Sequence, residues 1–193
     1  MELYKAMQTR RSIRKYKPDP VPREVITRIL EIATWAPSGL NWQQWHYLVV
    51  TGPKKEELAR SYGRIVEFGM PPAGQRTPQQ EGFLQWSKTL GGAPVAIVAL
   101  SPAHGQPGVR KMNLESVAAS FCHLLLAATN EGLGTCWMTG PLNNEPELRK
   151  VLAIPADKEI VAVTPLGYPD ENPAAAPRKS LEEVVTWLGF QGE

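Results

Sequence analysis

The chain has 193 residues, of which 42% are hydrophobic and 21% charged, and its net charge is +2. This length favours one domain over two, and so small a positive charge argues against a nucleic-acid-binding protein, whose basic surface usually raises the charge of the whole domain. The two cysteines and three histidines lack the spacing of a metal site, and no apolar run approaches the ~20 residues that a membrane span needs.

The first half of the chain is predicted to contain helices, two strands and one long irregular loop. Apolar residues recur at helical spacing from Arg23 to Trp35, Pro22 suits the first turn of that helix, and Pro37 ends it. The loop 69–78 is too rich in proline and glycine for regular structure, and a loop of this size often forms the lid or wall of a site. The predicted elements are helices at 2–9, 23–35, 54–66 and 80–90, and strands at 46–51 and 94–100.

The second half is dominated by a predicted helix at 109–131 whose apolar residues cover nearly its whole circumference. Such a helix is buried on all sides, and in a domain of this size that favours burial partly against a second subunit; a central helix in a monomer core is the alternative. The remaining elements are an extended segment at 135–138, a helix at 144–152 capped by Asn143 or Asn144, a strand at 159–165, a proline-rich arm at 170–178 and a short segment at 180–188. Helices and strands mix without a strict βαβ rhythm, which predicts an α+β fold.

The cysteines and the N-terminus indicate the environment of the protein. Cys122 lies within the apolar helical pattern, so we expect a reduced, buried thiol and no disulfide with Cys136. The N-terminal sequence MELYKAMQTR has no apolar signal-peptide core, so we expect a cytoplasmic protein. We expect no bound metal, no nucleic-acid partner and no membrane partner.

The basic run RRSIRKY at residues 10–16 is the first candidate for ligand binding. In an extended chain Arg10, Ser12 and Arg14 fall on one side, because successive side chains alternate. Two guanidinium groups and a hydroxyl on one side suit a phosphate, to which arginine makes bidentate, charge-assisted hydrogen bonds. From spacing alone, a solvated basic turn is the alternative.

Two further segments could line a ligand. The first, APSGLNWQQW at 36–45, offers hydroxyl and amide groups that could bond to a flat polar ring, and tryptophans that could stack on it. The second, GLGTCWMTG at 132–140, contains glycines that let backbone N–H groups approach a ligand closely. Taken alone, the first segment is better explained as an ordinary helix-to-strand turn with core tryptophans, and the second as a helix C-cap that leads to a strand.

The sequence offers no catalytic side chains of its own. It contains no Ser/His/Asp order, Walker loop or GxGxxG sequence, and no pair of carboxylates suggests acid–base catalysis. An enzyme of this kind takes its chemistry from a cofactor.

In their order along the chain, these segments resemble the FMN-dependent nitroreductase family. The resemblance rests on RRSIRKY, APSGLNWQQWHYLVV, GLGTCWMTG, an arginine after the proline-rich arm and LEEVV, and it covers nearly the whole chain. It implies a nitroreductase-like α+β fold with a central mixed sheet flanked by helices, and a single FMN-binding domain over residues 1–193. It also implies an intertwined homodimer, joined through long helices and C-terminal arms, with FMN in the interface.

The resemblance also implies which residues hold FMN. The phosphate and ribityl chain would be bound by Arg10, Ser12 and Arg14, with Arg11 contributing its backbone or charge and Arg178 as a further phosphate ligand. The isoalloxazine ring would be contacted from the other subunit by Pro37, Ser38, Gly39 and Asn41. Along the ring, near its reactive nitrogen, would lie Thr139 and Gly140, with Trp137 and Met138 beside them. The family often has proline at the position of Gln44, a difference that changes the stiffness of this loop.

The implied activity is reduction of nitroaromatic, quinone or similar acceptors by NADH or NADPH. Donor and acceptor would use one place over the flavin in turn, which predicts ping-pong kinetics. Two alternatives are a dimeric flavin carrier or sensor without turnover, and a family relative with another reaction, such as flavin destruction or reductive dehalogenation.

Overall fold

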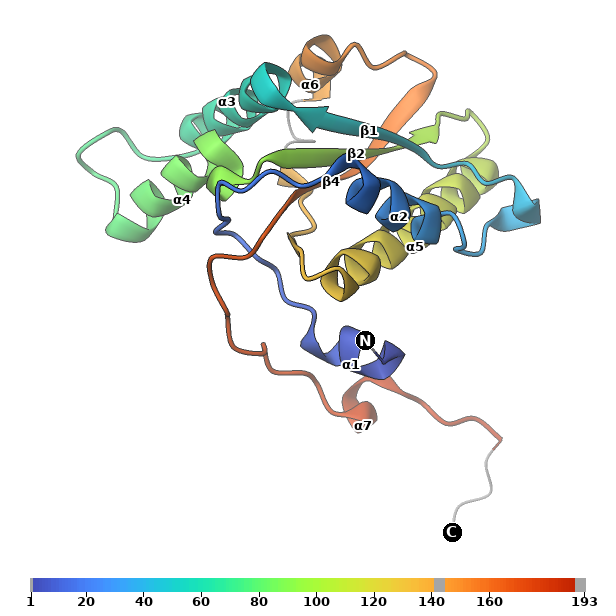
Figure 1. Cartoon of the computed structure of the whole chain (residues 1–193). Coiled ribbons are helices and arrows are strands. Elements are labelled where there is room, and N and C mark those ends of the chain that lie inside the picture. The colour runs from blue at the N-terminus through green and yellow to red at the C-terminus, as the bar shows by residue number, and fades with distance from the viewer. Residues whose placement is uncertain (1, 141–144, 190–193) are drawn as a thin grey trace.

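The computed structural model describes residues 2–140 and 145–189, which form a sheet with helices on both faces (Figure 1). The sheet has four strands in the order β1-β2-β4-β3, and all three strand pairs are antiparallel. The strands are β1 (His46–Thr51), β2 (Val95–Pro102), β3 (Gly134–Thr135) and β4 (Lys158–Gly167). Within the described residues, the only parallel pairing is a single bridge between Ser12 and Thr135, so the predicted mixed sheet is mixed only at this edge.

Strand β2 separates two hydrophobic cores, because its successive side chains point to opposite faces. Val95, Ile97 and Ala99 pack with α2 (Arg23–Ala33) and α5 (Pro107–Asn130). Ala96, Val98 and Leu100 pack with α3 (Gly52–Phe68) and α6 (Glu145–Leu152). The apolar run at 94–100 is therefore a central strand buried on both faces, as predicted.

The remaining helices lie around this body. Helix α4 (Pro78–Thr89) packs against α3. Two short 3-10 turns flank this part of the chain: η1 (Gly39–Asn41) precedes β1, and η2 (Leu90–Gly92) follows α4. Helices α1 (Leu3–Thr9) and α7 (Leu181–Val184) lie outside the body, the latter at the end of an extended arm (Figure 1). In the described part of the chain, no helix is long and apolar enough to cross a membrane.

The element boundaries differ from the predictions mainly at helix ends. Helix α3 begins at Gly52, because Pro53 is well placed in a first turn, and α4 begins at Pro78 after a capping box between Thr77 and Gln80. The predicted extended segment 135–138 is a two-residue strand, followed by a bridge between Met138 and Val163. The caps predicted at Asn143 and Asn144 lie outside the described residues.

Helix α5 is buried on one side only within its own chain. Residues such as Val117, Phe121 and Leu124 are fully buried, whereas Cys122 is exposed. The expectation of a buried Cys122 is therefore wrong for the single chain, because this residue points away from the sheet to a side that no described element covers. Both cysteines are free, as predicted.

Candidate cofactor site

The basic segment 10–16 is held against the edge of the sheet beside β3. The amide of Ile13 donates a hydrogen bond of 2.9 Å to the carbonyl of Thr135, next to the bridge that joins Ser12 and Thr135. Gly134 permits this contact, since a Cβ there would lie 2.8 Å from three side-chain atoms of Ile13. The fold thus brings the first and third sequence segments together.

Ser12, Arg10 and Arg14 lie near enough to the thiol of Cys136 to act on its pKa. Burial raises the pKa of this thiol, whereas the charges of Arg14 and Arg10 and a hydrogen bond from Ser12 act in the opposite direction. Charges have such an effect only at short range. These three residues alternate along the extended segment and are here called the basic cluster.

Arg11 points elsewhere. Its guanidinium donates to the carbonyl of Gln8 at 2.6 Å and to that of Arg10 at 3.0 Å, both at the C-terminal end of α1. Cations are stabilised at this end of a helix, where backbone carbonyls lack partners within the helix. The side chain of Arg11 is therefore bound to α1 and not directed into the basic cluster.

The chain that follows β4 fixes the other side of segment 10–16. The carboxylate of Glu171 accepts hydrogen bonds from the backbone amides of Arg14 and Lys15, and the amide of Asp170 donates to the carbonyl of Lys15 at 2.9 Å. Sequence reasoning missed Glu171, because a carboxylate that binds backbone amides has no sequence pattern of its own. Arg178 lies further along this arm and is exposed, and no described contact joins it to the basic cluster.

The third segment continues from β3 past α5 to α3. Met138 is buried and exchanges backbone hydrogen bonds of 2.8 and 3.1 Å with Val163. Trp137 packs edge-on against Phe121, with ring centroids 4.7 Å apart, and Thr139 is exposed. Gly140 is packed so closely against Tyr62 that a Cβ would lie 2.6 Å from the phenol oxygen.

The second segment forms a strained loop between α2 and β1. Leu40, Asn41 and Gln43 have φ angles of 54°, 54° and 51°, in the left-handed region that side-chain-bearing residues rarely adopt. The loop is fixed by hydrogen bonds of 3.1 Å from the Gly39 amide to the Ser116 hydroxyl and from the Gln43 amide to the Ser38 hydroxyl. Several strained residues in one loop commonly mark a functional contact.

This loop is separated from the other two segments within one chain. Figure 1 shows α2 and α5 between the loop and segment 10–16. Pro37 and Asn41 are exposed, and Ser38 and Gly39 are partly covered. A single chain therefore assembles two of the three sequence segments and presents the third on another side.

Two orphaned polar atoms lie in these segments. The hydroxyl oxygen of Thr135 and the amide oxygen of Gln44 are buried and have no hydrogen-bond partner in the described residues. Buried polar atoms are nearly always paired, so such atoms point to a ligand, a water or a partner chain that completes the site. Among the same residues no group of three or more His, Cys, Asp or Glu side chains could hold a metal ion.

The described residues thus form an α+β body in which a basic segment and a glycine-containing segment meet at one edge of the sheet. The model of the Nitroreductase family matches residues 7–168. The chain belongs to the nitroreductase family.

Curated relatives and solved structures agree with this assignment. The chain is 35% identical to the iodotyrosine deiodinase of Nematostella vectensis, over 95% of this chain and 74% of that protein. It is 33% identical to human iodotyrosine deiodinase 1, over 95% and 68% of the two chains. Its fold matches the FMN and NADPH-dependent nitroreductase NfnB of Sphigopyxis sp. strain HMH with a TM-score of 0.82, at 23% identity over 98% and 100% of the chains. A Desulfovibrio desulfuricans protein solved in complex with FMN matches with a TM-score of 0.76, at 27% identity over 99% of both chains.

Proposed function

We propose that this protein is an FMN-dependent oxidoreductase that takes electrons from NADH or NADPH and reduces a small aromatic acceptor such as a nitroarene or quinone. The observation that carries the proposal is the backbone pairing that brings the segment of Arg10, Ser12 and Arg14 beside Gly134 and Thr135. This pairing supports one FMN-binding domain spanning residues 1–193. We also propose a cytoplasmic location.

The residues present fit FMN, which is the cofactor. The basic cluster suits the phosphate, because guanidinium groups and a hydroxyl bind phosphate oxygens with charge-assisted hydrogen bonds. Segment 137–140 would line the ring: Thr139 is exposed, and Met138 fixes the backbone by its pairing with Val163. The unpartnered hydroxyl of Thr135 lies beside Ser12, where it could accept or donate a hydrogen bond to the ligand.

The site is completed, in this proposal, by a second copy of the chain. A groove of about 730 Å³ is lined by apolar side chains of α1, α2, α5 and the turn after α2. Among them are the exposed Leu3, Met7, Ile32 and Trp35 and the partly buried Leu126. The C-terminal arm carries further exposed apolar residues, Leu181, Val184, Trp187 and Leu188. Large exposed apolar patches usually mark an interface. A dimer would cover them and would bring the Pro37–Asn41 loop of one subunit to the basic cluster of the other.

Bound FMN supplies two-electron chemistry, accepting a hydride from a nicotinamide and passing electrons to an acceptor. The protein contributes binding, orientation and charge. Arg14 would stabilise negative charge on the reduced cofactor, and backbone amides of segment 137–140 would donate toward the ring. Trp42, which is 53% exposed in the strained loop, would pack on a flat acceptor from the partner side.

Reductive dehalogenation of a halogenated phenol is the second candidate reaction. It is favoured by the iodotyrosine deiodinases, to which the chain is 33–35% identical over 95% of its length. The same basic cluster would hold the cofactor, so the two reactions differ only in the acceptor. A flavin carrier or sensor without turnover is distinguished from both by the absence of steady-state oxidation of NAD(P)H.

The first experiment is an absorbance spectrum of the purified protein, followed by anaerobic addition of NADH or NADPH. We expect a yellow protein whose flavin absorbance bleaches, and is restored by a nitroarene or quinone. Release of iodide from iodotyrosine by the reduced protein, without reoxidation by nitroarenes, would favour dehalogenation. A colourless protein that takes up no FMN would refute the proposal.

A second experiment tests the phosphate site. Arg14→Gln should weaken FMN binding by tenfold or more, because loss of one charge-assisted pair costs about 1.5–3 kcal/mol. Arg11→Gln is a matched variant, since its guanidinium binds α1 carbonyls, and it should weaken binding several-fold less. Equal losses in the two variants would contradict the assignment.

A further inference from the structure

One side of α5 carries a row of buried polar side chains. Asn113, Ser116 and Ser120 recur at helical spacing and are at most 5% exposed. Asn113 donates to the carbonyl of Pro102 at 3.3 Å, and Ser120 donates to that of Ala33 at 2.7 Å. Since buried polar groups are nearly always paired, the row marks a set of fixed contacts between α5 and the chain around it.

Ser116 is the member of this row that reaches the strained loop. Its hydroxyl donates to the carbonyl of Met112, one turn earlier in α5, at 2.7 Å. A serine hydroxyl has a single proton, so its oxygen meets the Gly39 amide, at 3.1 Å, as an acceptor. The bond to Met112 therefore orients the hydroxyl so that a lone pair is presented to the loop.

The backbone polar groups of Gly39 are all paired within their own chain. Its amide donates to Ser116, and its carbonyl accepts from the amide of Trp42 at 3.1 Å and from the side-chain amide of Gln44 at 3.4 Å. Its α-carbon is covered by Met112, because a Cβ there would overlap that side chain. The loop is therefore anchored at Gly39, and the Gly39 amide is not free to bind a cofactor.

The residues beside Gly39 keep polar groups for a ligand. The Ser38 hydroxyl accepts from the amide of Gln43 at 3.1 Å, and its proton has no acceptor in the described part of the chain. The side chain of Asn41 is exposed. Leu40, Asn41 and Gln43 have left-handed φ angles, a conformation that persists only where surrounding contacts fix it. The contact between Gly39 and α5 supplies such a fixed point.

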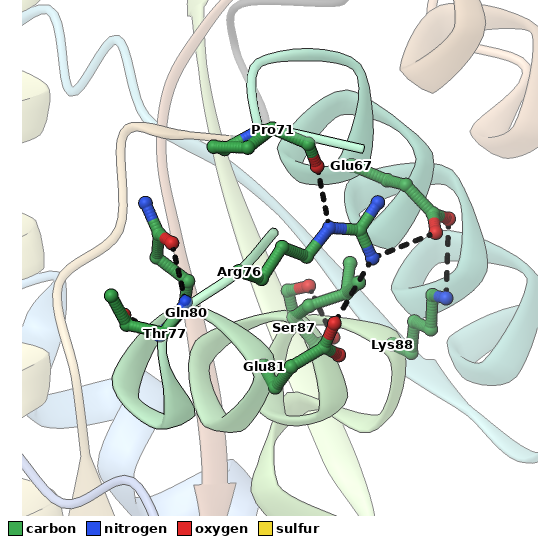
Figure 2. Close-up of polar contacts among 9 residues, drawn as sticks. Glu67, Pro71, Arg76, Thr77, Gln80, Glu81, Ser87 and Lys88 are labelled. Carbon is green, nitrogen blue, oxygen red and sulfur yellow. Dashed lines mark hydrogen bonds and ion pairs between the residues drawn. The ribbon is translucent and has the colours of Figure 1, made fainter. Parts of the chain in front are cut away.

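A second buried serine makes the same kind of bond to its own helix but holds no loop. Ser87 of α4 is fully buried, and its hydroxyl donates to the carbonyl of Leu84 at 2.7 Å (Figure 2). Among the described residues, no loop amide donates to the Ser87 oxygen. Ser87 and Ser116 thus share burial and the bond to the helix and differ in the contact with a loop, so Ser87 is a matched control.

We propose that Ser116 is a positioning residue that anchors Gly39 and thereby holds Ser38 and Asn41 toward the FMN of the other subunit. The inference rests on the proposed function, because it assigns the loop to FMN bound between two subunits. Ser116 acts through the Gly39 amide and touches neither cofactor nor acceptor. Loss of its hydroxyl leaves that amide without an acceptor and frees the loop, while the basic cluster stays intact.

The test compares Ser116→Ala and Ser116→Thr with the control Ser87→Ala. Alanine removes the hydroxyl, whereas threonine keeps one that can bond to the same helix carbonyl. On the FMN-loaded protein we measure hydrogen exchange of the Gly39 amide and the position of the flavin absorbance bands, and a titration gives the Kd of FMN. A serine that only stabilised its helix would lower the melting temperature and leave the flavin bands unchanged.

For Ser116→Ala we expect exchange of the Gly39 amide to rise at least about tenfold, the Kd of FMN to rise about tenfold, and the flavin bands to shift toward those of free FMN. Ser116→Thr should restore all three values most of the way to wild type, and Ser87→Ala should leave them unchanged. Unchanged exchange at Gly39, or faster exchange with an unchanged Kd and spectrum, would overturn the inference. If Ser116→Thr does not fold, the comparison of Ser116→Ala with Ser87→Ala decides on the same measurements.

Failure of the proposed function gives a different result. A wild-type protein that takes up no FMN refutes the proposed function and, with it, the role of Ser116 toward the cofactor. A wild-type protein that binds FMN but is reduced by neither NADH nor NADPH refutes the oxidoreductase proposal alone, because Gly39 exchange, the Kd of FMN and the flavin bands still report on Ser116.

Discussion

Gly134 is the point at which the contact between the basic segment and β3 can be tested most directly. In Gly134→Ala the new Cβ would lie 2.8 Å from Cβ, Cγ1 and Cγ2 of Ile13, whereas ordinary contacts begin near 3.4 Å. Ile13 is buried, and its β-branched side chain has little rotational freedom, so it cannot turn away. The basic segment must therefore move by about 0.6 Å, the difference between these two distances.

The expected effect is overpacking, which costs about 1–3 kcal/mol. For a domain of this size each kcal/mol lowers the melting temperature by roughly 2–4 °C, so the decrease should be about 2–12 °C. The shift also displaces Ser12, so FMN affinity should fall roughly tenfold, which corresponds to about 1.4 kcal/mol. Thermal unfolding of the apoprotein and fluorescence titration with FMN measure the two effects separately.

Gly108→Ala is the matched control, because no atom lies within 4 Å of the new Cβ in the first turn of α5. It should be neutral or stabilise the protein by up to about 1 kcal/mol. Adding Ile13→Ala to Gly134→Ala should recover part of the lost affinity, since the two residues are in contact and their effects are not additive. Wild-type melting temperature and FMN affinity in Gly134→Ala would refute the reasoning.

Two other predictions concern the proposed dimer and the response to pH. Leu126→Glu places a carboxylate in the apolar groove and should convert the proposed dimer to a monomer that loses FMN. Val49→Glu, at a residue exposed on β1, should leave the proposed dimer intact in sedimentation. An FMN-loaded dimer of Leu126→Glu would contradict the groove as interface. Burial raises the pKa of three phenols, to about 12 for Tyr47. The folded state therefore holds protons that the unfolded chain releases near pH 10, so stability should fall above that pH by about 1.4 kcal/mol per pH unit for each phenol. A melting temperature that is constant from pH 9 to 11 would exclude this contribution from the phenols of Tyr16, Tyr47 and Tyr62.

The sequence predicts best those features that depend on local pattern. The apolar run at 94–100 and the spacing of apolar residues in 109–131 fix the central strand and α5, because burial imposes those periods directly. The three candidate cofactor segments also stand out, because each combines residue types with a shared chemistry. Their relative placement depends on long-range contacts, such as that of Ile13 with Gly134, which no local pattern contains.

The residues that sequence reasoning placed incorrectly or missed depend on partners distant in the chain. The apolar neighbours of Cys122 predict burial, but which side of α5 meets the sheet is decided by packing. Ser116 looks like one polar residue in an apolar helix until Gly39 is brought to it by the packing of the strained loop on α5.

The strained loop between α2 and β1 provides a test of whether the candidate cofactor site of one chain depends on a second chain. Leu40 has a φ of 54° and is 74% exposed, so in a single chain its side chain gains little from burial to offset a backbone conformation that costs about 1–2 kcal/mol. In Leu40→Gly that strain disappears, while the greater freedom of glycine in the unfolded chain costs about 0.5–1 kcal/mol. The melting temperature of the apoprotein should therefore stay constant or rise slightly.

The same substitution should weaken FMN binding if Leu40 contacts the cofactor or the partner subunit. The increase in melting temperature on adding FMN should then become smaller, because that increase reports ligand affinity. A lower melting temperature of the apoprotein with an undiminished FMN-induced increase would mean that Leu40 stabilises its own chain. The strain at 40–43 would then have no connection with the cofactor, and the separation of this loop from the basic cluster would no longer support a site shared between two subunits.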